Sequence, residues 1–364
     1  MIRILHTIDT TGPGGAENVF VNLAKGLDPR QFSSFAAITG PGWVHDELKK
    51  NGIEPFFIPS QGGYNFKYLL ELIRIIRQKK IDVVQSHLLG SNLYSSLAGM
   101  ICRVPVVSTF HGFVDASEND RLMPIKNRVI LLGSKKIVFV SERLREHFLQ
   151  RYHFPTNRSE TIYNGVDTSV FRPQRDDSVR KELGIAPGHI LIGALGNIRP
   201  AKGYEYFLKA ARLVCDEHPE CRFAIAGEGS GPLHEDLLKL RRDLKLEGSF
   251  FFLGFREDAA KVLNNLDIFL LPSVSEGFSI STIEAMACRI PVIVTRSGGP
   301  EEIVQNGMNG ISVGCDASEM ANAILRLIDD VQLCKNISYH GYSSVIEKFT
   351  LSRMINEYRG IYQH

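Results

Sequence analysis

The sequence contains little cysteine and has no long hydrophobic run. Its 364 residues include six cysteines, and their positions show no metal-ligand spacing. No run of about 18 apolar residues occurs, so we expect no membrane-spanning helix. The opening MIRILHTIDTTGPGG lacks the long apolar core of a signal peptide. We therefore expect reduced, buried thiols in a chain that stays in the cytoplasm.

A strong net charge is also missing. The formal net charge is +2, which argues against a dedicated nucleic-acid-binding protein. Basic residues are nevertheless concentrated in 121–151, which holds eight of them against two acidic residues. Such a local field attracts anionic membrane surfaces, so peripheral contact with the inner face of the cell membrane is one interpretation. A solvated helix face followed by an ordinary strand is the alternative.

Short apolar runs alternate with helical patterns along the chain. Val83–Ser86 and Val106–Phe110 have the length and composition of buried strands. Gly15–Leu27 carries apolar residues along one helical stripe. This alternation predicts an α/β protein whose parallel sheets are covered by helices.

The alternation pauses near 164–188, which is rich in Asn, Asp, Pro and Gly. We therefore expect two doubly wound, Rossmann-like domains, 1–172 and 173–342. The last helix, about 343–363, is long enough to cross back to the first domain. Ligands of open α/β sheets bind at the carboxyl ends of the strands, so we expect an active site in the cleft between the domains.

The most informative motif is LLPSVSEGFSISTIEAMACRIPVIVT, residues 270–295. It predicts a strand ending at Pro272, a loop holding Glu276, and a helix that begins near Ser279. Glu284 follows on the second turn of this helix. Two glutamates at this spacing can also be ordinary surface charges of a helix, which is the alternative interpretation.

The same motif has the groups that a sugar nucleotide needs. Free backbone N–H groups at the helix start, around Ile280 and Ser281, can bind phosphate oxygens. Glu284 can accept two hydrogen bonds from ribose hydroxyls, and Glu276 can reach hydroxyls of a transferred sugar. The sequence therefore predicts a nucleotide-sugar site at this helix start.

Two further loops have features of phosphate recognition. Gly14 and Gly15 precede a helix, where backbone without side chains can approach a diphosphate; an ordinary tight turn before a helix is the alternative. Arg199 and Lys202 follow an apolar strand and can neutralise a leaving diphosphate. A solvated basic loop is the alternative there.

Taken in order, these motifs resemble glycosyltransferase family 4, whose members have the GT-B fold. The resemblance covers almost the whole chain and rests on six further motifs, which are GPGGAE at 12–17, STFHG at 108–112, YNGVDTSVFRP at 163–173, GNIRPAKG at 196–203, AGEG at 226–229 and FLGF at 252–255.

The resemblance implies a retaining enzyme that uses a nucleoside-diphosphate sugar. It assigns acceptor binding to 1–172 and donor binding to 173–342, and places His111 beside the donor sugar. The expected catalytic residues are Glu276, Lys202, Arg199 and His111. The expected donor-binding residues are Gly14, Gly15, Asn197, Glu228, Arg256, Gly277, Phe278, Ser279, Ile280, Ser281 and Glu284.

Two positions depart from the family pattern. Asn197 stands where members often have arginine, and we expect Arg199 to substitute for it. Ser279 stands where many relatives have glycine or a small apolar residue, which leaves the contacts with the donor sugar open.

The sequence also lacks a DxD motif in a strand-end loop, so we expect neither a metal ion nor another cofactor. A UDP-sugar is favoured over a GDP-sugar as donor, with a glycan or lipid-linked glycan as acceptor, in cell-surface polysaccharide or glycolipid assembly. Alternatives on the same fold are a sugar-nucleotide epimerase, a phosphorylase or a non-catalytic sugar-nucleotide-binding subunit. A nicotinamide dehydrogenase is disfavoured because GPGGAE does not have the GxGxxG spacing.

Overall fold

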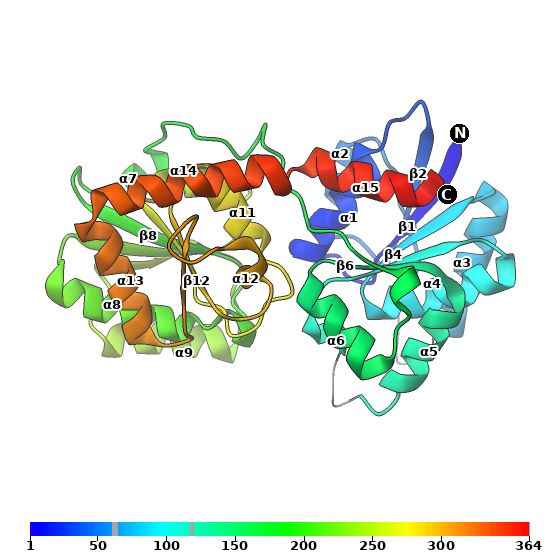
Figure 1. Cartoon of the computed structure of the whole chain (residues 1–364), viewed down its shortest axis with the longest axis horizontal. Coiled ribbons are helices and arrows are strands. Elements are labelled where there is room, and N and C mark those ends of the chain that lie inside the picture. Colours follow the sequence, from blue (N-terminus) through cyan, green and yellow to red (C-terminus); the bar gives the residue numbers. More distant parts are fainter. Residues whose placement is uncertain (60–64, 117–119, 364) are drawn as a thin grey trace. The chain divides into compact units, whose positions relative to one another are not determined.

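The computed structural model describes residues 1–59, 65–116 and 120–363 (Figure 1). It divides into two compact units. The first unit contains Met1–Asn164 and Leu351–His364, and the second contains Gly165–Thr350. The division lies at Asn164 rather than near 172, because the Val166 N–H donates to the Phe349 carbonyl at 2.9 Å and ties this segment to the second unit.

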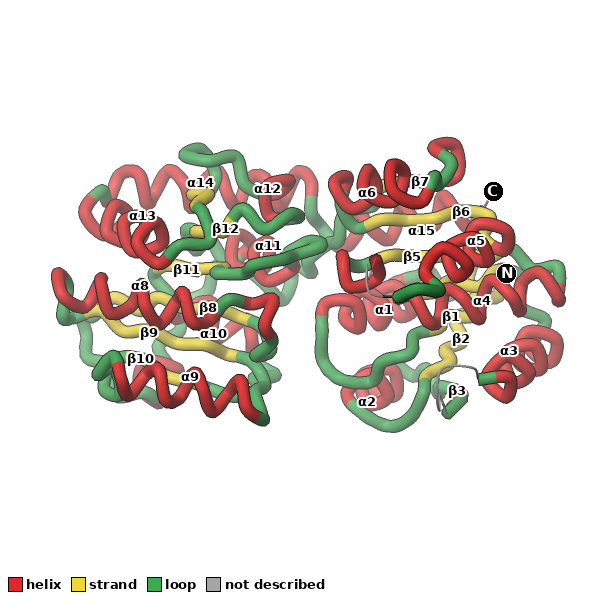
Figure 2. The backbone as a smooth tube through the Cα atoms, turned by 90° about the horizontal axis from the view of Figure 1, so that it is seen from below, coloured by secondary structure: helices red, strands yellow, loops and turns green. Residues whose placement is uncertain are grey.

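Among the described residues, the first unit has one seven-stranded parallel sheet in the order β3-β2-β1-β4-β5-β6-β7. Helices cover this sheet (Figure 2). The strands are β1 (Ile2–Thr7), β2 (Phe32–Ile38), β3 (Phe56–Phe57), β4 (Val83–His87), β5 (Val106–Phe110), β6 (Ser134–Phe139) and β7 (Ser159–Thr161). The α-helices are α1 (Gly15–Gly26), α2 (Trp43–Lys50), α3 (Phe66–Lys79), α4 (Leu89–Cys102), α5 (Met123–Gly133), α6 (Glu142–Tyr152) and α15 (Leu351–Gln363), with short 3₁₀ turns at η1 (Phe113–Ala116) and η2 (Thr156–Arg158).

The described part of the second unit has a six-stranded parallel sheet in the order β10-β9-β8-β11-β12-β13. Its strands are β8 (Ile190–Leu195), β9 (Cys221–Ala226), β10 (Phe250–Phe252), β11 (Ile268–Leu271), β12 (Val292–Thr295) and β13 (Ile311–Val313). Its helices are α7 (Ser178–Glu182), η3 (Pro200–Lys202), α8 (Tyr204–Glu217), α9 (Pro232–Asp243), α10 (Ala259–Asn265), α11 (Ile280–Ala287), α12 (Pro300–Ile303), α13 (Ala317–Asp329) and α14 (Val331–Lys348).

Both sheets have the strand order of doubly wound α/β folds, which confirms the expected fold class. In each sheet the strand order reverses beside the first strand, between β1 and β4 in one unit and between β8 and β11 in the other. Loops that follow the strands at such a point diverge and leave room for a ligand. The loops after β8 and β11 are therefore the natural place for a site in the second unit.

The sequence pattern predicts one last helix over 343–363, whereas the structure has two. Helix α14 ends before Phe349, and α15 begins at Leu351. Helix α15 packs on α1 in the first unit: a Cβ on Gly26 would lie only 2.3 Å from the Ile355 Cδ1 atom. Tyr358 and Tyr362 on α15 are almost completely buried. In the described ranges no helix is both long and apolar enough to cross a bilayer.

Candidate functional site

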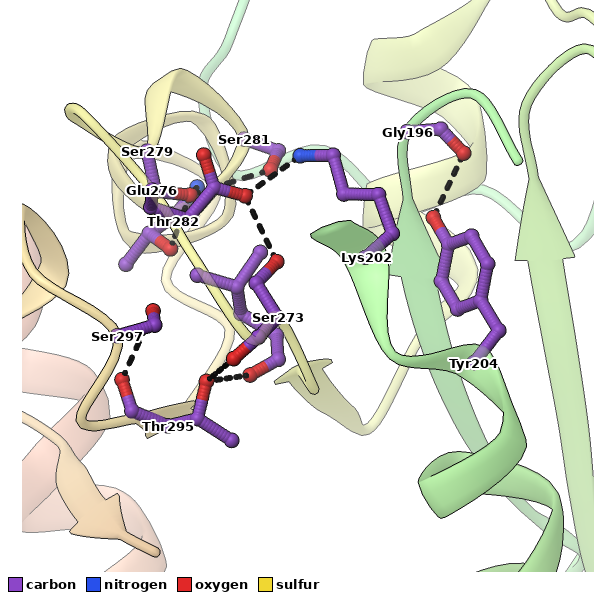
Figure 3. A network of polar contacts seen from close by, with 11 residues as sticks. Gly196, Lys202, Tyr204, Ser273, Glu276, Ser279, Ser281, Thr282, Thr295 and Ser297 are labelled. Atoms are coloured by element: carbon purple, nitrogen blue, oxygen red, sulfur yellow. Dashed lines mark hydrogen bonds and ion pairs between the residues drawn. The ribbon is translucent and has the colours of Figure 1, made fainter. Parts of the chain in front are cut away.

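The loop after β11 places a carboxylate against a cation. Glu276 accepts hydrogen bonds at Oε1 from the Lys202 Nζ atom at 2.6 Å and from the Ser273 hydroxyl at 2.7 Å (Figure 3). The side chains of Lys202 and Glu276 are 23% and 12% exposed, so water screens this ion pair only in part. The structure thus brings together two of the sequence-predicted catalytic residues.

The backbone of Glu276 is held in place by the loop after β12. Its N–H donates to the Ser297 carbonyl, and its own carbonyl accepts from the Gly299 N–H, both at 3.0 Å. A Cβ on Gly299 would lie 2.3 Å from the Gly277 carbonyl oxygen, so only glycine allows the two loops to approach this closely. The position of the carboxylate is therefore set by main-chain contacts.

Helix α11 begins directly after this loop. The Ser279 hydroxyl caps it by accepting from the Thr282 N–H at 3.3 Å and from the Thr282 hydroxyl at 2.8 Å. The first N–H groups of a helix have no partner within the helix, which leaves the amides of Ile280 and Ser281 suited to an anion. The start of α11 is thus a candidate phosphate site beside Glu276.

Glu284 lies one turn along the same helix. It follows Ile280 by four residues, so both lie on one face of α11. Burial raises the pKa of the Glu284 carboxyl to about 7. A carboxylate that lacks hydration in the free protein gains most from hydroxyl donors of a ligand.

The loop after β8 supplies the cations. Lys202 ends the short η3 turn, and Arg199, just before that turn, is exposed. The Tyr204 hydroxyl donates to the Gly196 carbonyl at 2.6 Å (Figure 3). A Cβ on Gly227 would lie 1.9 Å from the same carbonyl oxygen, so the AGEG turn packs directly on this loop.

Asn197 has a structural contact that the sequence did not reveal. Its side-chain oxygen accepts from the Glu228 N–H at 3.0 Å, and the Ile198 N–H donates to the Glu228 carbonyl at 2.7 Å. Asn197 therefore braces the AGEG turn against the cationic loop. Glu228 itself is exposed.

Two other predicted donor-binding residues make contacts away from the ion pair. The Arg256 guanidinium donates to the Glu182 carboxylate at 2.8 and 2.9 Å and to the Asp258 carboxylate at 2.8 and 2.9 Å. Phe278 is buried, with its ring centroid 5.8 Å from that of Phe349.

In the first unit, the predicted glycines lie at the start of α1. Gly14 is the residue before the helix, and Gly15 is its exposed first residue. A Cβ on Gly14 would lie 2.3 Å from the Glu17 Oε2 atom, so glycine lets this side chain fold over the helix start. In the structure this end of α1 thus faces a carboxylate of its own first turn.

His111 belongs to a polar cluster at the carboxyl ends of β4 and β5. Its Nε2 atom lies 2.8 Å from the His87 Nδ1 atom, and its backbone N–H donates to Asp115 at 2.9 Å. Burial lowers the pKa of His111 to about 3 and raises the pKa of Asp115 to about 6. Neither His87 nor Asp115 is among the residues predicted from sequence, although the polar end of the strand VVQSH was a usable signal for His87.

Comparisons with known proteins match both units. A family model described as "Glycosyltransferase Family 4" matches residues 13–170, and one described as "Glycosyl transferases group 1" matches residues 175–344. An Escherichia coli UDP-Gal:alpha-D-GlcNAc-diphosphoundecaprenol alpha-1,3-galactosyltransferase is 24% identical over 99% of this chain and 96% of its own. The N-acetyl-alpha-D-glucosaminyl L-malate synthase of Bacillus anthracis is 27% identical over 96% of this chain and 93% of its own.

The fold is also found in a solved structure. The crystal structure of Anabaena HepE in complex with UDP-glucose superposes with a TM-score of 0.91 at 21% identity, over 99% of both chains. With both family models matched and the fold shared throughout, the chain belongs to the group 1, family 4 glycosyltransferases, which are retaining GT-B enzymes that use nucleoside-diphosphate sugars.

Proposed function

We propose that the chain transfers a sugar from a UDP-sugar to a glycan or lipid-linked glycan acceptor during assembly of a cell-surface polysaccharide or glycolipid. The Lys202–Glu276 pair beside the start of α11 carries this proposal. It places a cation and a carboxylate next to free helix amides, in the loops that follow the neighbouring strands β8 and β11. The Anabaena structure contains UDP-glucose, and the name of the Escherichia coli relative specifies a UDP-galactose donor and a diphosphoundecaprenol-linked sugar. These names support the choice of donor base and acceptor class.

Positively charged side chains and backbone amides both contact the leaving diphosphate. Lys202 and Arg199 supply positive charge, and the amides at Ile280 and Ser281 supply oriented N–H donors. In the free protein Lys202 is paired with Glu276. A bound diphosphate competes for Lys202, which releases the Glu276 carboxylate to accept hydrogen bonds from hydroxyls of the donor sugar.

Retention follows from attack on the face that the diphosphate leaves. The bond between the anomeric carbon and the diphosphate oxygen breaks first and gives a short-lived oxocarbenium ion pair. The acceptor oxygen then bonds to the anomeric carbon on the same face, and the departing phosphate oxygen takes the acceptor's proton. The protein's main task in this step is electrostatic stabilisation of the leaving group.

The donor class is tested with a panel of UDP-, GDP- and ADP-sugars in a thermal-shift assay. We expect a UDP-sugar to stabilise the chain most, by ~2.7 kcal/mol at 100 times its Kd. Product analysis with the best donor then separates glycosyl transfer from epimerisation, because an epimerase needs no acceptor. Stabilisation by none of the three donor classes contradicts the proposal.

Replacing Lys202 tests the role of the cationic loop. Lys202→Ala is expected to lower turnover about 10²–10³-fold, the scale of losing one preorganised donor to developing charge. Steady-state kinetics with the donor that the thermal-shift panel selects measures the effect. Lys239→Ala, which removes an exposed lysine on α9, is the matched control and should leave turnover unchanged. A rate near that of the wild type in Lys202→Ala rules out the assigned role.

Glu284 gives the donor affinity a pH dependence. Its pKa is raised to about 7 in the free protein, while ribose hydroxyls donate to the ionised form, so binding favours loss of the proton. The Kd for UDP-glucose should therefore rise about 5-fold on going from pH 7 to pH 6, because half of the carboxyl groups are ionised at pH 7 and about a tenth at pH 6, as measured by calorimetry. Glu284→Gln should bind weakly with a flat profile over this range. An unchanged slope in that variant assigns the titration to another group.

The acceptor proposal includes contact with an anionic membrane through 121–151. On α5, Ile125, Arg128 and Leu132 follow one another at helical spacing and are all exposed, with Ile125 62% and Leu132 67% exposed. Arg121, two residues before the helix, is exposed as well. Apolar and basic side chains on one face suit the boundary between lipid tails and anionic headgroups.

Vesicle flotation tests this surface. The chain should float with anionic vesicles at low salt and less so at high salt, because basic residues are attracted to the headgroups. The double variant Ile125→Ser/Leu132→Ser should reduce flotation. The control Met308→Ser/Val331→Ser removes two similarly exposed apolar side chains from the second unit, 56% and 59% exposed, and should not. Flotation that is absent or insensitive to salt removes the membrane from the proposal.

A further inference from the structure

A continuous chain of buried hydrogen bonds links the C-terminal helix to His111. The Tyr362 hydroxyl on α15 donates to the Gln85 Oε1 atom at 2.8 Å. The Gln85 Nε2 atom lies 3.3 Å from the His87 Nε2 atom. The His87 Nδ1 atom lies 2.8 Å from the His111 Nε2 atom. Tyr362 and His111 are far apart in sequence, yet three side-chain contacts connect them.

The orientation of the Gln85 amide sets which atoms along this hydrogen-bonded path donate and which accept. The Gln85 nitrogen lies 3.3 Å from the Ser86 carbonyl oxygen and 2.9 Å from the Thr109 hydroxyl. A carbonyl oxygen only accepts, so the side-chain atom facing it is the amide NH₂ group, and the Gln85 oxygen faces Tyr362. The amide nitrogen has two N–H groups to share among these three neighbours and does not itself accept, so the His87 Nε2 atom beside it is placed as an acceptor.

The histidine tautomers follow in sequence. A neutral imidazole carries its proton on one nitrogen only, so His87 with an accepting Nε2 is protonated at Nδ1. The His87 Nδ1–H group then donates to the His111 Nε2 atom, which leaves the His111 proton on Nδ1. Burial keeps both rings neutral, since it lowers the pKa of His111 to about 3 and that of His87 well below its usual range.

The His111 Nδ1 atom is the last atom of this hydrogen-bonded path. Within the described ranges it makes no hydrogen bond, and the His111 side chain is partly exposed. The main-chain N–H of His111 is held separately by Asp115, which also accepts from the Leu89 N–H at 3.1 Å. His111 is thus held from two sides with one N–H left to donate.

We propose that Tyr362, Gln85 and His87 are positioning residues that hold His111 as a neutral Nδ1–H donor toward a ligand oxygen at the carboxyl ends of β4 and β5. The inference rests on the proposed function for the identity of that oxygen. Neutrality matters as much as position, because positive charge develops on the sugar ring as the diphosphate leaves and a cationic imidazole beside it would oppose that charge. A partner that fixes the tautomer of a functional histidine is usually worth about 10–100-fold in activity when the histidine binds a metal.

The tautomer is measured in the free protein by NMR of ¹⁵N-histidine, with His111 assigned by its loss in His111→Ala. We expect a protonated Nδ1 and an unprotonated Nε2 in the wild type. Gln85→Met removes the donor to His87 and should give mixed tautomers at His111. Tyr362→Phe removes the contact to the Gln85 oxygen while the Ser86 carbonyl still holds the Gln85 nitrogen, so it should give a smaller change in the same direction. Protonation at Nε2 in the wild type, or an unchanged His111 in both variants, overturns the proposal.

Tyr358→Phe is the matched control. It deletes another buried tyrosine hydroxyl of α15, which lies 3.2 Å from the Thr109 hydroxyl. Thr109 also contacts the Gln85 nitrogen, but the Ser86 carbonyl holds that nitrogen independently, so the amide orientation is kept in this variant. It should cost similar stability to Tyr362→Phe and leave the His111 signals in place.

Kinetics with the donor chosen above completes the test. Gln85→Met should lower kcat about 10-fold with little change in the KM for the donor, and Tyr358→Phe should change neither. A shifted tautomer with wild-type kcat overturns the positioning role. Failure of the proposed function appears separately, as the absence of donor binding in the wild type, because the NMR measurement needs no donor.

Discussion

The ion pair between Lys202 and Glu276 is the interaction on which the candidate site of the second unit depends. The two residues are 74 positions apart and meet because β8 and β11 are neighbours in the sheet. Partial burial of both charges costs hydration, and a buried pair of this kind is weak evidence for stability alone. Its position at the reversal of strand order instead favours a binding role, in which the pair exchanges partners when an anion arrives.

Close main-chain contacts between loops make this exchange possible without rebuilding the site. Gly299 packs on Gly277, and Gly227 packs on Gly196, at distances that exclude any side chain. The proposed exchange therefore requires movement of the two charged side chains only, on a backbone that hydrogen bonds hold in place. Asn197 contributes to the same rigidity through the Glu228 N–H, which gives a physical role to a residue that departs from the family pattern.

In the first unit, a path of buried hydrogen bonds that includes two neutral imidazole rings holds His111 in place. Gln85 and Thr109 lie on adjacent strands, and the hydroxyls of α15 reach both of them. Because α14 ends before Phe349 and α15 begins anew, the last thirteen-residue helix belongs to the first unit. The end of the chain is in this way part of the environment of His111.

Local patterns in the sequence determined the class of fold and the residues of the candidate donor site. Strand–helix alternation and the segment 270–295 depend on neighbouring residues only, so the alternating strands and helices and the start of α11 were predicted in advance. The roles suggested for Glu276, Lys202 and Glu284 stay predictions. Tertiary structure alone decided the pairing of Lys202 with Glu276, the bracing by Asn197, the ion pairs of Arg256 and the chain from Tyr362 to His111. These depend on strand order and on side-chain direction, and hydrophobic periodicity carries neither, because it records which residues are buried and not which residues they meet.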